Sequence, residues 1–181
     1  MITHKSASEA ISILKNGGLI IYPTEGVYGL GCDALNEKSV KEVFKIKFRS
    51  HEKSFITICS DISQLDGLIH SDYMTDKKIT KFDFTTWIIP IDDSCPCWLS
   101  KDDNIAVRIS NHPVVKDLCN GLGKPLISTS ANISNQEYEN NLNHISKLFD
   151  KKVECIVEGK LGGKNTPSKI IDIVTGSVLR N

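Results

Sequence analysis

The stretch LIIYPTEGVYGLGCDA (residues 19–34) decides the fold, because a short apolar run leads directly into a glycine-rich segment there. Leu19–Tyr22 has the continuous apolar character of a strand that is buried on both faces. Pro23 has no backbone N–H, so we expect regular strand pairing to stop at this residue. Three glycines then let the backbone approach another body closely. The segment is either a tight strand-to-helix connection or one wall of a binding site.

The rest of the chain alternates between apolar runs of strand length and stretches with helical periodicity. This alternation predicts an α/β sandwich with a largely covered, mixed sheet. The chain contains no internal repeat and no linker-like segment, so we expect one domain over residues 1–181. The expected helices are 6–16, 36–46, 61–69, 112–122 and 142–149; the expected strands are 19–22, 55–59, 85–91, 105–109, 125–128, 153–157, 169–174 and 177–179.

Composition excludes some classes of protein. The 181 residues carry 22 basic and 22 acidic side chains, so the formal net charge is zero. Nothing in the overall charge therefore indicates nucleic acid or membrane binding, and any anion binding must come from a local site. No apolar run approaches the roughly 20 residues that cross a bilayer, and the first residues lack the apolar core of a signal peptide. We expect a cytoplasmic protein.

The cysteines do not indicate a metal site. The six cysteines have no repeating spacing, which is typical of reduced thiols rather than a disulfide framework. Cys95 and Cys97 form the one close pair, but C-x-C lacks the usual zinc-ligand interval and no second pair matches it. The five histidines show no metal-binding arrangement either. We predict no protein-held metal.

Lys47 and Arg49 flank Phe48 at the end of a charged helix. If the chain turns into an extended conformation there, the two cations point the same way and Phe48 points into the core. Two cations on one side suit a triphosphate, with lysine as a point charge and arginine as a fork. The alternative is a solvated helix face, as in most charge runs.

Hydroxyl and amide side chains follow an apolar strand at Ser128, Ser130 and Asn132. They either cap a turn or line the carboxyl edge of the sheet, where open α/β sheets hold ligands. Arg108 lies inside an apolar strand, so an internal carboxylate or an anionic ligand should meet it. The remaining polar candidates at strand ends are Thr86 and Ser168.

Several catalytic motifs are missing. The chain has no G-x-x-x-x-G-K-[ST] loop, no G-x-G-x-x-G after a strand and no G-x-S-x-G elbow. The site therefore looks suited to holding and neutralising a polyanion without a covalent nucleophile. Phosphoryl and nucleotidyl transfers are commonly catalysed in this way.

Taken together, five segments resemble the YrdC/Sua5 family, and specifically its short, single-domain bacterial members. The segments span nearly the whole chain, and the combination of PT-x-x-VYGLG, K-x-R and S-x-SAN is highly specific. They are PTEGVYGLGCDA (23–34), KFR (47–49), NIAVRISNHP (104–113), GKPLISTSANIS (123–134) and TPSKIIDI (166–173).

The resemblance implies a twisted sheet flanked by helices, with an open, positively lined concave cavity. It implies that L-threonine, bicarbonate and ATP react to form threonylcarbamoyl-AMP and pyrophosphate, a nucleotidyl transfer. The product would feed N6-threonylcarbamoyladenosine formation at position 37 of tRNA. Mg²⁺ would arrive with ATP, held by phosphates and water. Implied partners are the downstream transfer proteins and, weakly, tRNA.

The family's site residues carry over to matching positions of this sequence. Thr24 and Ser130 would hold the threonine or its carbamoyl group, and Lys47 and Arg49 would bind the triphosphate as catalytic residues. The further nucleotide contacts would be Thr86, Arg108, Ser128, Asn132 and Ser168.

Three positions depart from the family's pattern. The family usually has threonine where Gly26 stands and proline where Ser50 stands. The usual W-P-G-P-[LV]-T segment is replaced by residues 81–86, which keep only the final Thr86.

Two rival functions remain at this stage. A non-catalytic RNA-binding module could use the same basic concavity, but zero net charge and 7% aromatic residues count against it. An enzyme acting on a phosphorylated sugar is disfavoured, because the sequence has no obvious acidic metal cluster.

Overall fold

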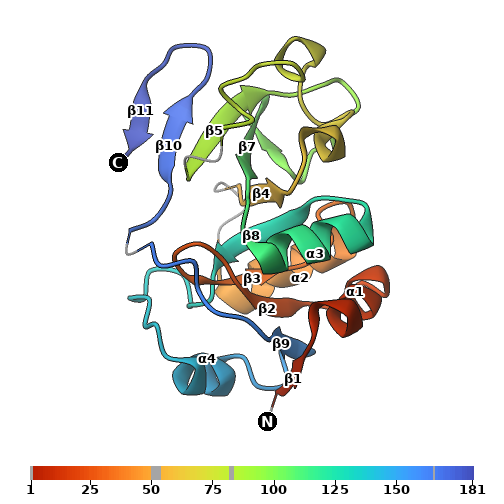
Figure 1. The fold of residues 1–181 in the computed structure, drawn as a ribbon, viewed down its shortest axis with the longest axis vertical. Coiled ribbons are helices and arrows are strands. Elements are labelled where there is room, and N and C mark those ends of the chain that lie inside the picture. The colour runs from red at the N-terminus through yellow and green to blue at the C-terminus, as the bar shows by residue number, and fades with distance from the viewer. Residues whose placement is uncertain (1, 50–53, 82–83, 165) are drawn as a thin grey trace.

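The computed structural model describes residues 2–49, 54–81, 84–164 and 166–181. Its described strands form a mixed sheet in the order β1-β9-β2-β3-β8-β4-β7-β5-β10-β11, with β6 paired to β7 at the side. β8 joins the two halves of this sheet, since it pairs antiparallel with both β3 and β4. Figure 1 shows β1, β9, β2 and β3 in the half with the N-terminus, and β7, β5, β10 and β11 in the other half.

The described strands are short and their bounds differ in places from the expected ones. They are β1 (Thr3–Lys5), β2 (Ile20–Pro23), β3 (Tyr28–Gly31), β4 (Ile56–Cys59), β5 (Thr85–Pro90), β6 (Ser100–Lys101), β7 (Asn104–Ile109), β8 (Leu126–Ser130), β9 (Cys155–Val157), β10 (Lys169–Asp172) and β11 (Val178–Arg180).

The described α-helices confirm four of the five expected ones. They are α1 (Ala7–Lys15), α2 (Glu37–Lys47), α3 (Pro113–Leu122) and α4 (Leu142–Leu148). α1 begins with the expected capping box: Ser6 accepts from the Glu9 N–H while Glu9 reaches back to the Ser6 N–H. The fifth expectation, 61–69, is wrong, because only a 3₁₀ turn, Ile62–Leu65, forms there.

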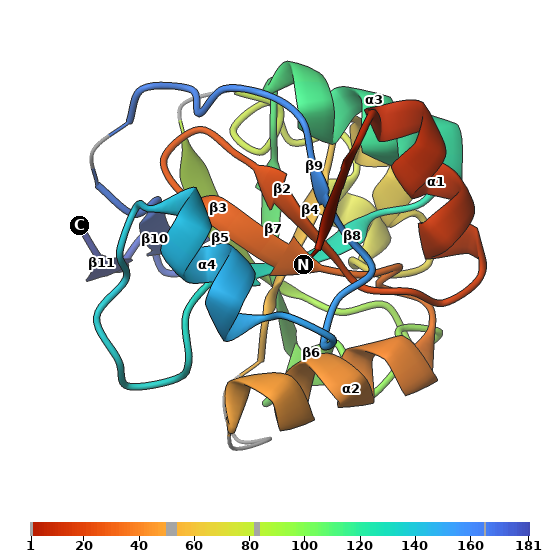
Figure 2. The same ribbon diagram turned by 90° about the horizontal axis from the view of Figure 1, so that it is seen from below.

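Helices cover both faces of the sheet, with α1 and α3 on one face and α2 on the other (Figure 2). Ile20 and Tyr22 pack with α1 and α3, whereas Ile21 packs in the cluster that contains the apolar side chains of α2. Successive side chains of β2 thus enter opposite layers of the core. The prediction of a strand buried on both faces is confirmed.

The glycine-rich segment is more regular than the sequence suggested. Residues 28–31 form β3, and Pro23 is opposite Tyr28 in the β2–β3 pair, so pairing continues to the proline. Proline is tolerated there because it is the last residue of its strand. A Cβ on Gly31 would collide with the carbonyl oxygen of Ile127. Gly31 therefore permits the close approach of β3 to β8.

Other features match or lie outside the expectations. All six cysteines are free. Three strands were not predicted from the sequence: β3, and also β1 and β6, which are only three and two residues long. No described helix has the length and apolar character needed to span a membrane. Ser50 and residues 82–83, two places of departure from the family pattern, lie outside the described residues.

Candidate functional site

Two adjoining pockets lie along the sheet edge where β8 ends, and they share Arg49 and Ser130. The smaller has a volume of about 200 Å³ and is lined by Lys47, Phe48, Arg49, Ser130, Asn132, Ser134 and Asn135. The larger, of about 500 Å³, has a size typical of small-molecule sites. Its wall contains three arginines together with apolar and hydroxyl side chains. Its lining residues include Gly26, Phe84, Arg49, Arg108, Ser128, Ser130, Tyr138, Ser168 and Arg180.

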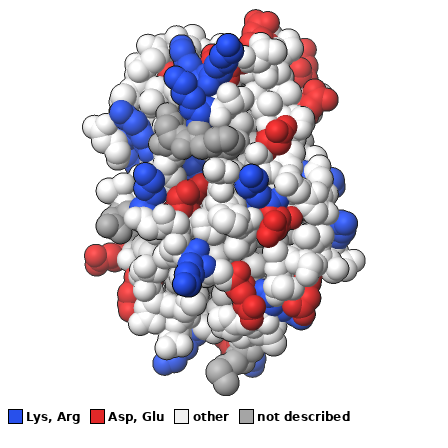
Figure 3. All heavy atoms as spheres, viewed as in Figure 1, with Lys and Arg blue, Asp and Glu red and all other residues white. Residues whose placement is uncertain are grey.

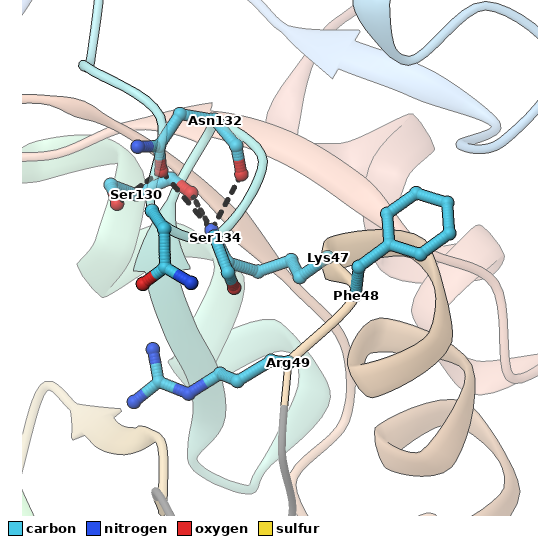
Figure 4. A pocket seen from close by; sticks show the side chains of 7 residues that line it. Lys47, Phe48, Arg49, Ser130, Asn132 and Ser134 are labelled. Carbon is cyan, nitrogen blue, oxygen red and sulfur yellow. Dashed lines mark hydrogen bonds between the residues drawn. The ribbon is translucent and has the colours of Figure 1, made fainter.

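Lys47 lies at the end of α2 and is only 1% exposed. Its ammonium donates hydrogen bonds to the Ser130 carbonyl at 2.6 Å, the Asn132 carbonyl at 2.7 Å and Asn132 Oδ1 at 3.2 Å (Figure 4). Burial and then the charge of Arg49 lower the pKa of Lys47 to about 7. The ammonium thus ties α2 to the segment after β8, and it carries a full charge only below neutral pH.

Phe48 does not point into the core as expected. It ends α2 in the left-handed region (φ 51°), and its side chain is 78% exposed. Figure 4 shows Lys47 and Arg49 extending to the same side and Phe48 extending away from both. The common direction of the two cations is confirmed, but the left-handed turn at Phe48 produces it rather than an extended strand.

Arg49 connects the two pockets. Its Nη2 donates to the carbonyl oxygen of Ser54 at 2.8 Å, and its guanidinium lies 4.9 Å from the ring centroid of Phe55. The ring and the carbonyl support Arg49 where it lines both pockets. Burial lowers the pKa of Arg49, but a guanidinium stays charged at neutral pH.

The hydroxyl row begins inside β8, since Ser128 and Ser130 belong to the strand rather than to the loop after it. Ser130 Oγ donates to Asn132 Oδ1 at 2.7 Å, and Asn132 Nδ2 donates to the Gln136 carbonyl at 2.6 Å. These bonds fix Asn132 with its oxygen toward Lys47. Ser128 and Ser130 both line the larger pocket.

Arg108 projects from β7 with 6% exposure and meets the internal carboxylate that its position required. Glu25 Oε2 lies 3.5 Å from Arg108 Nη2, while Glu25 Oε1 accepts a hydrogen bond from Ser110 Oγ. The guanidinium also lies 5.2 Å from the ring centroid of Phe84. Among the residues that the structure describes, Arg108 Nε and Glu25 Oε2 are buried and have no hydrogen-bond partner. The Arg108 guanidinium therefore has one donor that these residues do not use, and Arg108 is among the residues that line the larger pocket.

Thr86 and Ser168 form one unit with an arginine that the sequence analysis missed. Their hydroxyls lie 2.8 Å apart, and both residues are buried. Arg180 in β11 donates to the Ser168 carbonyl through Nε and Nη2, and to Ser168 Oγ at 3.1 Å. No local pattern marks Arg180, because it ends a three-residue exposed edge strand. It joins Arg49 and Arg108 in the pocket wall.

Thr24 lies apart from the other candidates. It is 1% exposed, and its hydroxyl donates to the Val27 carbonyl at 2.8 Å within its own loop. It lines neither pocket. Among the described residues no group of three or more His, Cys, Asp or Glu side chains could hold a metal ion. The described pocket walls contain no carboxylate side chain.

The fold and site define an α/β protein with a cation-lined, polyanion-sized pocket. The family model described as "Telomere recombination", which covers Sua5, YciO and YrdC, matches residues 12–181. The chain belongs to the Sua5/YciO/YrdC family.

Individual relatives agree with this. The chain is 39% identical to the Threonylcarbamoyl-AMP synthase of Pseudoalteromonas translucida, over 99% of this chain and 100% of the relative. It is similar to P. abyssi Sua5 complexed with L-threonine, with 27% identity and a TM-score of 0.84 over 97% of this chain. The match spans only 54% of that longer protein. E. coli YciO has 26% identity and a TM-score of 0.82, over 99% of this chain and 93% of YciO.

Proposed function

We propose that the protein is a threonylcarbamoyl-AMP synthase, a nucleotidyltransferase that forms threonylcarbamoyl-AMP and pyrophosphate from L-threonine, bicarbonate and ATP. The product would serve N6-threonylcarbamoyladenosine formation in tRNA. Full-length relatives at 35–39% identity carry the name of this enzyme, and a structural neighbour was solved with L-threonine.

The cation arrangement carries the proposal. Three arginines (Arg49, Arg108 and Arg180) line a pocket of about 500 Å³, and Lys47 lines the adjoining one. A triphosphate places several negative charges along one chain, so it is best bound by several cations from different directions. No nucleophilic side chain is required.

The proposed reaction has two steps, and the arginines would act in the second. The threonine amine attacks the bicarbonate carbon and water leaves, which gives a carbamate. A carbamate oxygen then forms a bond to the α-phosphorus of ATP, and the bond from that phosphorus to the bridging oxygen breaks. Pyrophosphate leaves with the electron pair of that bond. Arginines aimed at the departing phosphates would stabilise the charge that develops there.

The residue roles follow those the family pattern implies, with one addition, Arg180, and one change, at Thr24. Lys47 and Arg49 would bind the phosphates, and Ser130, which lines both pockets, would contact threonine or its carbamoyl group. Arg180 would be a further phosphate contact. The hydroxyl of Thr24 faces its own loop, so we assign Thr24 to holding that loop and keep a direct threonine contact as an alternative. The remaining nucleotide contacts would be Thr86, Arg108, Ser128, Asn132 and Ser168.

Mg²⁺ would enter with ATP. Since the described pocket walls offer no carboxylate, phosphate oxygens and water would supply its ligands, as Mg²⁺ commonly accepts. The protein would work in the cytoplasm and pass its unstable adenylate to proteins that transfer the threonylcarbamoyl group to tRNA. Weak direct tRNA contact is compatible with this role.

The proposal is tested by incubating the protein with ATP, Mg²⁺, threonine and bicarbonate. We expect pyrophosphate release that requires both threonine and bicarbonate, together with an adenylate product in the mass spectrum. Hydrolysis of ATP to ADP, or release that ignores threonine, would overturn it.

Binding measurements with ATP and with RNA address the RNA-binding alternative. Figure 3 shows Lys and Arg interspersed with Asp and Glu over most of one face, as expected for a chain of zero net charge. ATP binding without RNA supports the enzyme. Tight RNA binding with a steep salt dependence and no ATP binding would support the alternative.

A further inference from the structure

Phe84 has a backbone conformation that bulky side chains rarely adopt. It immediately precedes β5 with φ 61°, in the left-handed region. This region is sterically unfavourable for a residue with a large Cβ substituent, and such residues concentrate where surrounding contacts or function maintain them. Phe84 lines the larger pocket. We therefore expect the Phe84 ring to make a contact that offsets this unfavourable backbone conformation.

The Phe84 ring contacts a cation that has few other restraints. The guanidinium of Arg108 lies 5.2 Å from the ring centroid, within the range of a cation–π interaction. The Glu25 carboxylate is 3.5 Å away, and Arg108 Nε donates no hydrogen bond within the described part of the chain. Within the described part of the chain, the recorded contacts of this planar, 6% exposed cation are one long ion pair and one aromatic face.

Gly26 lies against this ring and, more tightly, against the backbone of the loop opposite. A Cβ on Gly26 would lie 3.4 Å from Phe84 Cζ, 3.1 Å from the Thr166 carbonyl oxygen and 3.2 Å from the Lys164 carbonyl oxygen. Any larger side chain would press on the ring or on the loop opposite. Gly26 and Phe84 both lie where the sequence departs from its family's usual pattern, so the two departures meet in space.

We infer that Phe84 is a positioning residue for Arg108: its ring, seated against Gly26, holds the guanidinium ready for an anionic group in the larger pocket. The inference rests on the proposed function only for the identity of that anion, which is a phosphate or carboxylate of the substrates. If the side chain of residue 84 only filled apolar space, any side chain of similar volume would serve and an aromatic ring would not be required.

The first test uses the ligand-free protein. We compare the side-chain Nε–Hε resonance of Arg108 in wild type, Phe84→Leu and Phe84→Tyr, with Arg108→Lys to assign it. The resonance should move in Phe84→Leu, which loses the ring, and stay near its wild-type position in Phe84→Tyr. An unmoved resonance in Phe84→Leu would overturn the inference, whatever reaction the protein catalyses.

The second test measures Mg-ATP affinity by calorimetry. Phe84→Leu should weaken it roughly 3- to 30-fold, the range for loss of a cation–π contact, and Phe84→Tyr should restore it. The same Phe84→Leu change in an Arg108→Gln protein should cost little more. Gly26→Ala should weaken binding in the same direction, while Tyr73→Leu, an aromatic removal outside both pockets, should not.

Equal losses from Phe84→Leu with and without Arg108 would show that Phe84 acts through bulk alone. If wild type fails to make the adenylate, the proposed function fails. The resonance comparison still tests whether the Phe84 ring lies over the Arg108 guanidinium, and the comparison with and without Arg108 separates positioning from bulk.

Discussion

The two sides of the site hold their buried cations in different ways. The ammonium of Lys47 has three oxygen acceptors within the protein, at 2.6, 2.7 and 3.2 Å. The guanidinium of Arg108 has a carboxylate oxygen at 3.5 Å, and its Nε has no hydrogen-bond partner among the described residues. Both residues are nearly inaccessible to solvent. Lys47 is therefore satisfied without a ligand, whereas Arg108 is not.

This difference separates stability from binding. A buried donor with internal acceptors contributes to folding, and its removal leaves those acceptors unsatisfied. A buried donor without a full set of partners costs folding free energy, which a ligand that bonds to it recovers. We expect the Lys47 side to act as structure as well as site, and the arginine side to act mainly on substrates.

The largest expected effect is that of Lys47→Met. It removes the ammonium and strands the Ser130 and Asn132 oxygens, so unfolding free energy should fall by about 2–5 kcal/mol. Turnover should fall as well, by roughly 10–1,000-fold. Urea unfolding and steady-state kinetics measure both. Lys45→Met, which removes an exposed lysine of the same helix, is the control. A Lys47→Met protein of wild-type stability would refute the structural half of this role.

Arg49→Met should separate the contribution to stability from the contribution to substrate binding. The Arg49 side chain is half-buried against Phe55, so its loss should change unfolding free energy by only about 1 kcal/mol. It should nevertheless reduce kcat/KM for ATP roughly 10–1,000-fold, because a charge-assisted phosphate contact disappears. Lys41→Met, on the outer side of α2, should leave both quantities unchanged. Wild-type kinetics in Arg49→Met would show that Arg49 does not contact the phosphates.

Amino-acid selection tests the Ser130 end of the larger pocket. If a hydroxyl there receives the threonine hydroxyl, wild type should prefer threonine to valine, because valine strands the polar partner. Serine should compete better than valine, since it loses only a methyl, worth about 1 kcal/mol. Ser130→Ala should narrow the threonine-to-valine ratio about tenfold, and Thr24→Ala should narrow it less.

The measurement is kcat/KM for threonine, serine and valine in the three proteins. Valine turnover equal to that of threonine in wild type would show that neither hydroxyl selects the substrate. The same conclusion would follow if neither substitution changed the ratio.

The sequence predicts those parts of the fold that strong local patterns determine. The apolar runs behind β2, β4, β7 and β8 and the caps of α1 and α2 are visible in the chain itself. So is the need of Arg108 for an internal carboxylate or an anionic ligand, because a cation inside an apolar strand must find a partner.

The misses have physical reasons. The exposed position of Phe48 depends on a left-handed turn that the residue types there do not indicate. Glu25 and Arg108 are distant in the sequence, and only the folded sheet brings them together. Arg180 reaches Ser168 because β11 folds back on β10. Each of these features depends either on contacts between residues distant in the chain or on a single backbone angle. Local sequence spacing predicts neither kind of feature.

The smallest expected effect on substrate binding is a pH dependence from Lys47, which also affects stability. Burial and then the charge of Arg49 lower the pKa of Lys47 from its ordinary value of 10.5 to about 7 in the folded protein. The unfolded chain therefore binds more protons above pH 7, so stability should rise between pH 7 and 10. ATP phosphates would raise this pKa, so binding should take up a proton and weaken about three- to fivefold from pH 7.5 to 8.5. Calorimetry in buffers of different ionisation enthalpy measures the uptake. Arg49→Met should move the decline to higher pH; a decline unmoved in that protein, or a flat wild-type profile, would remove Lys47 from the phosphate contacts.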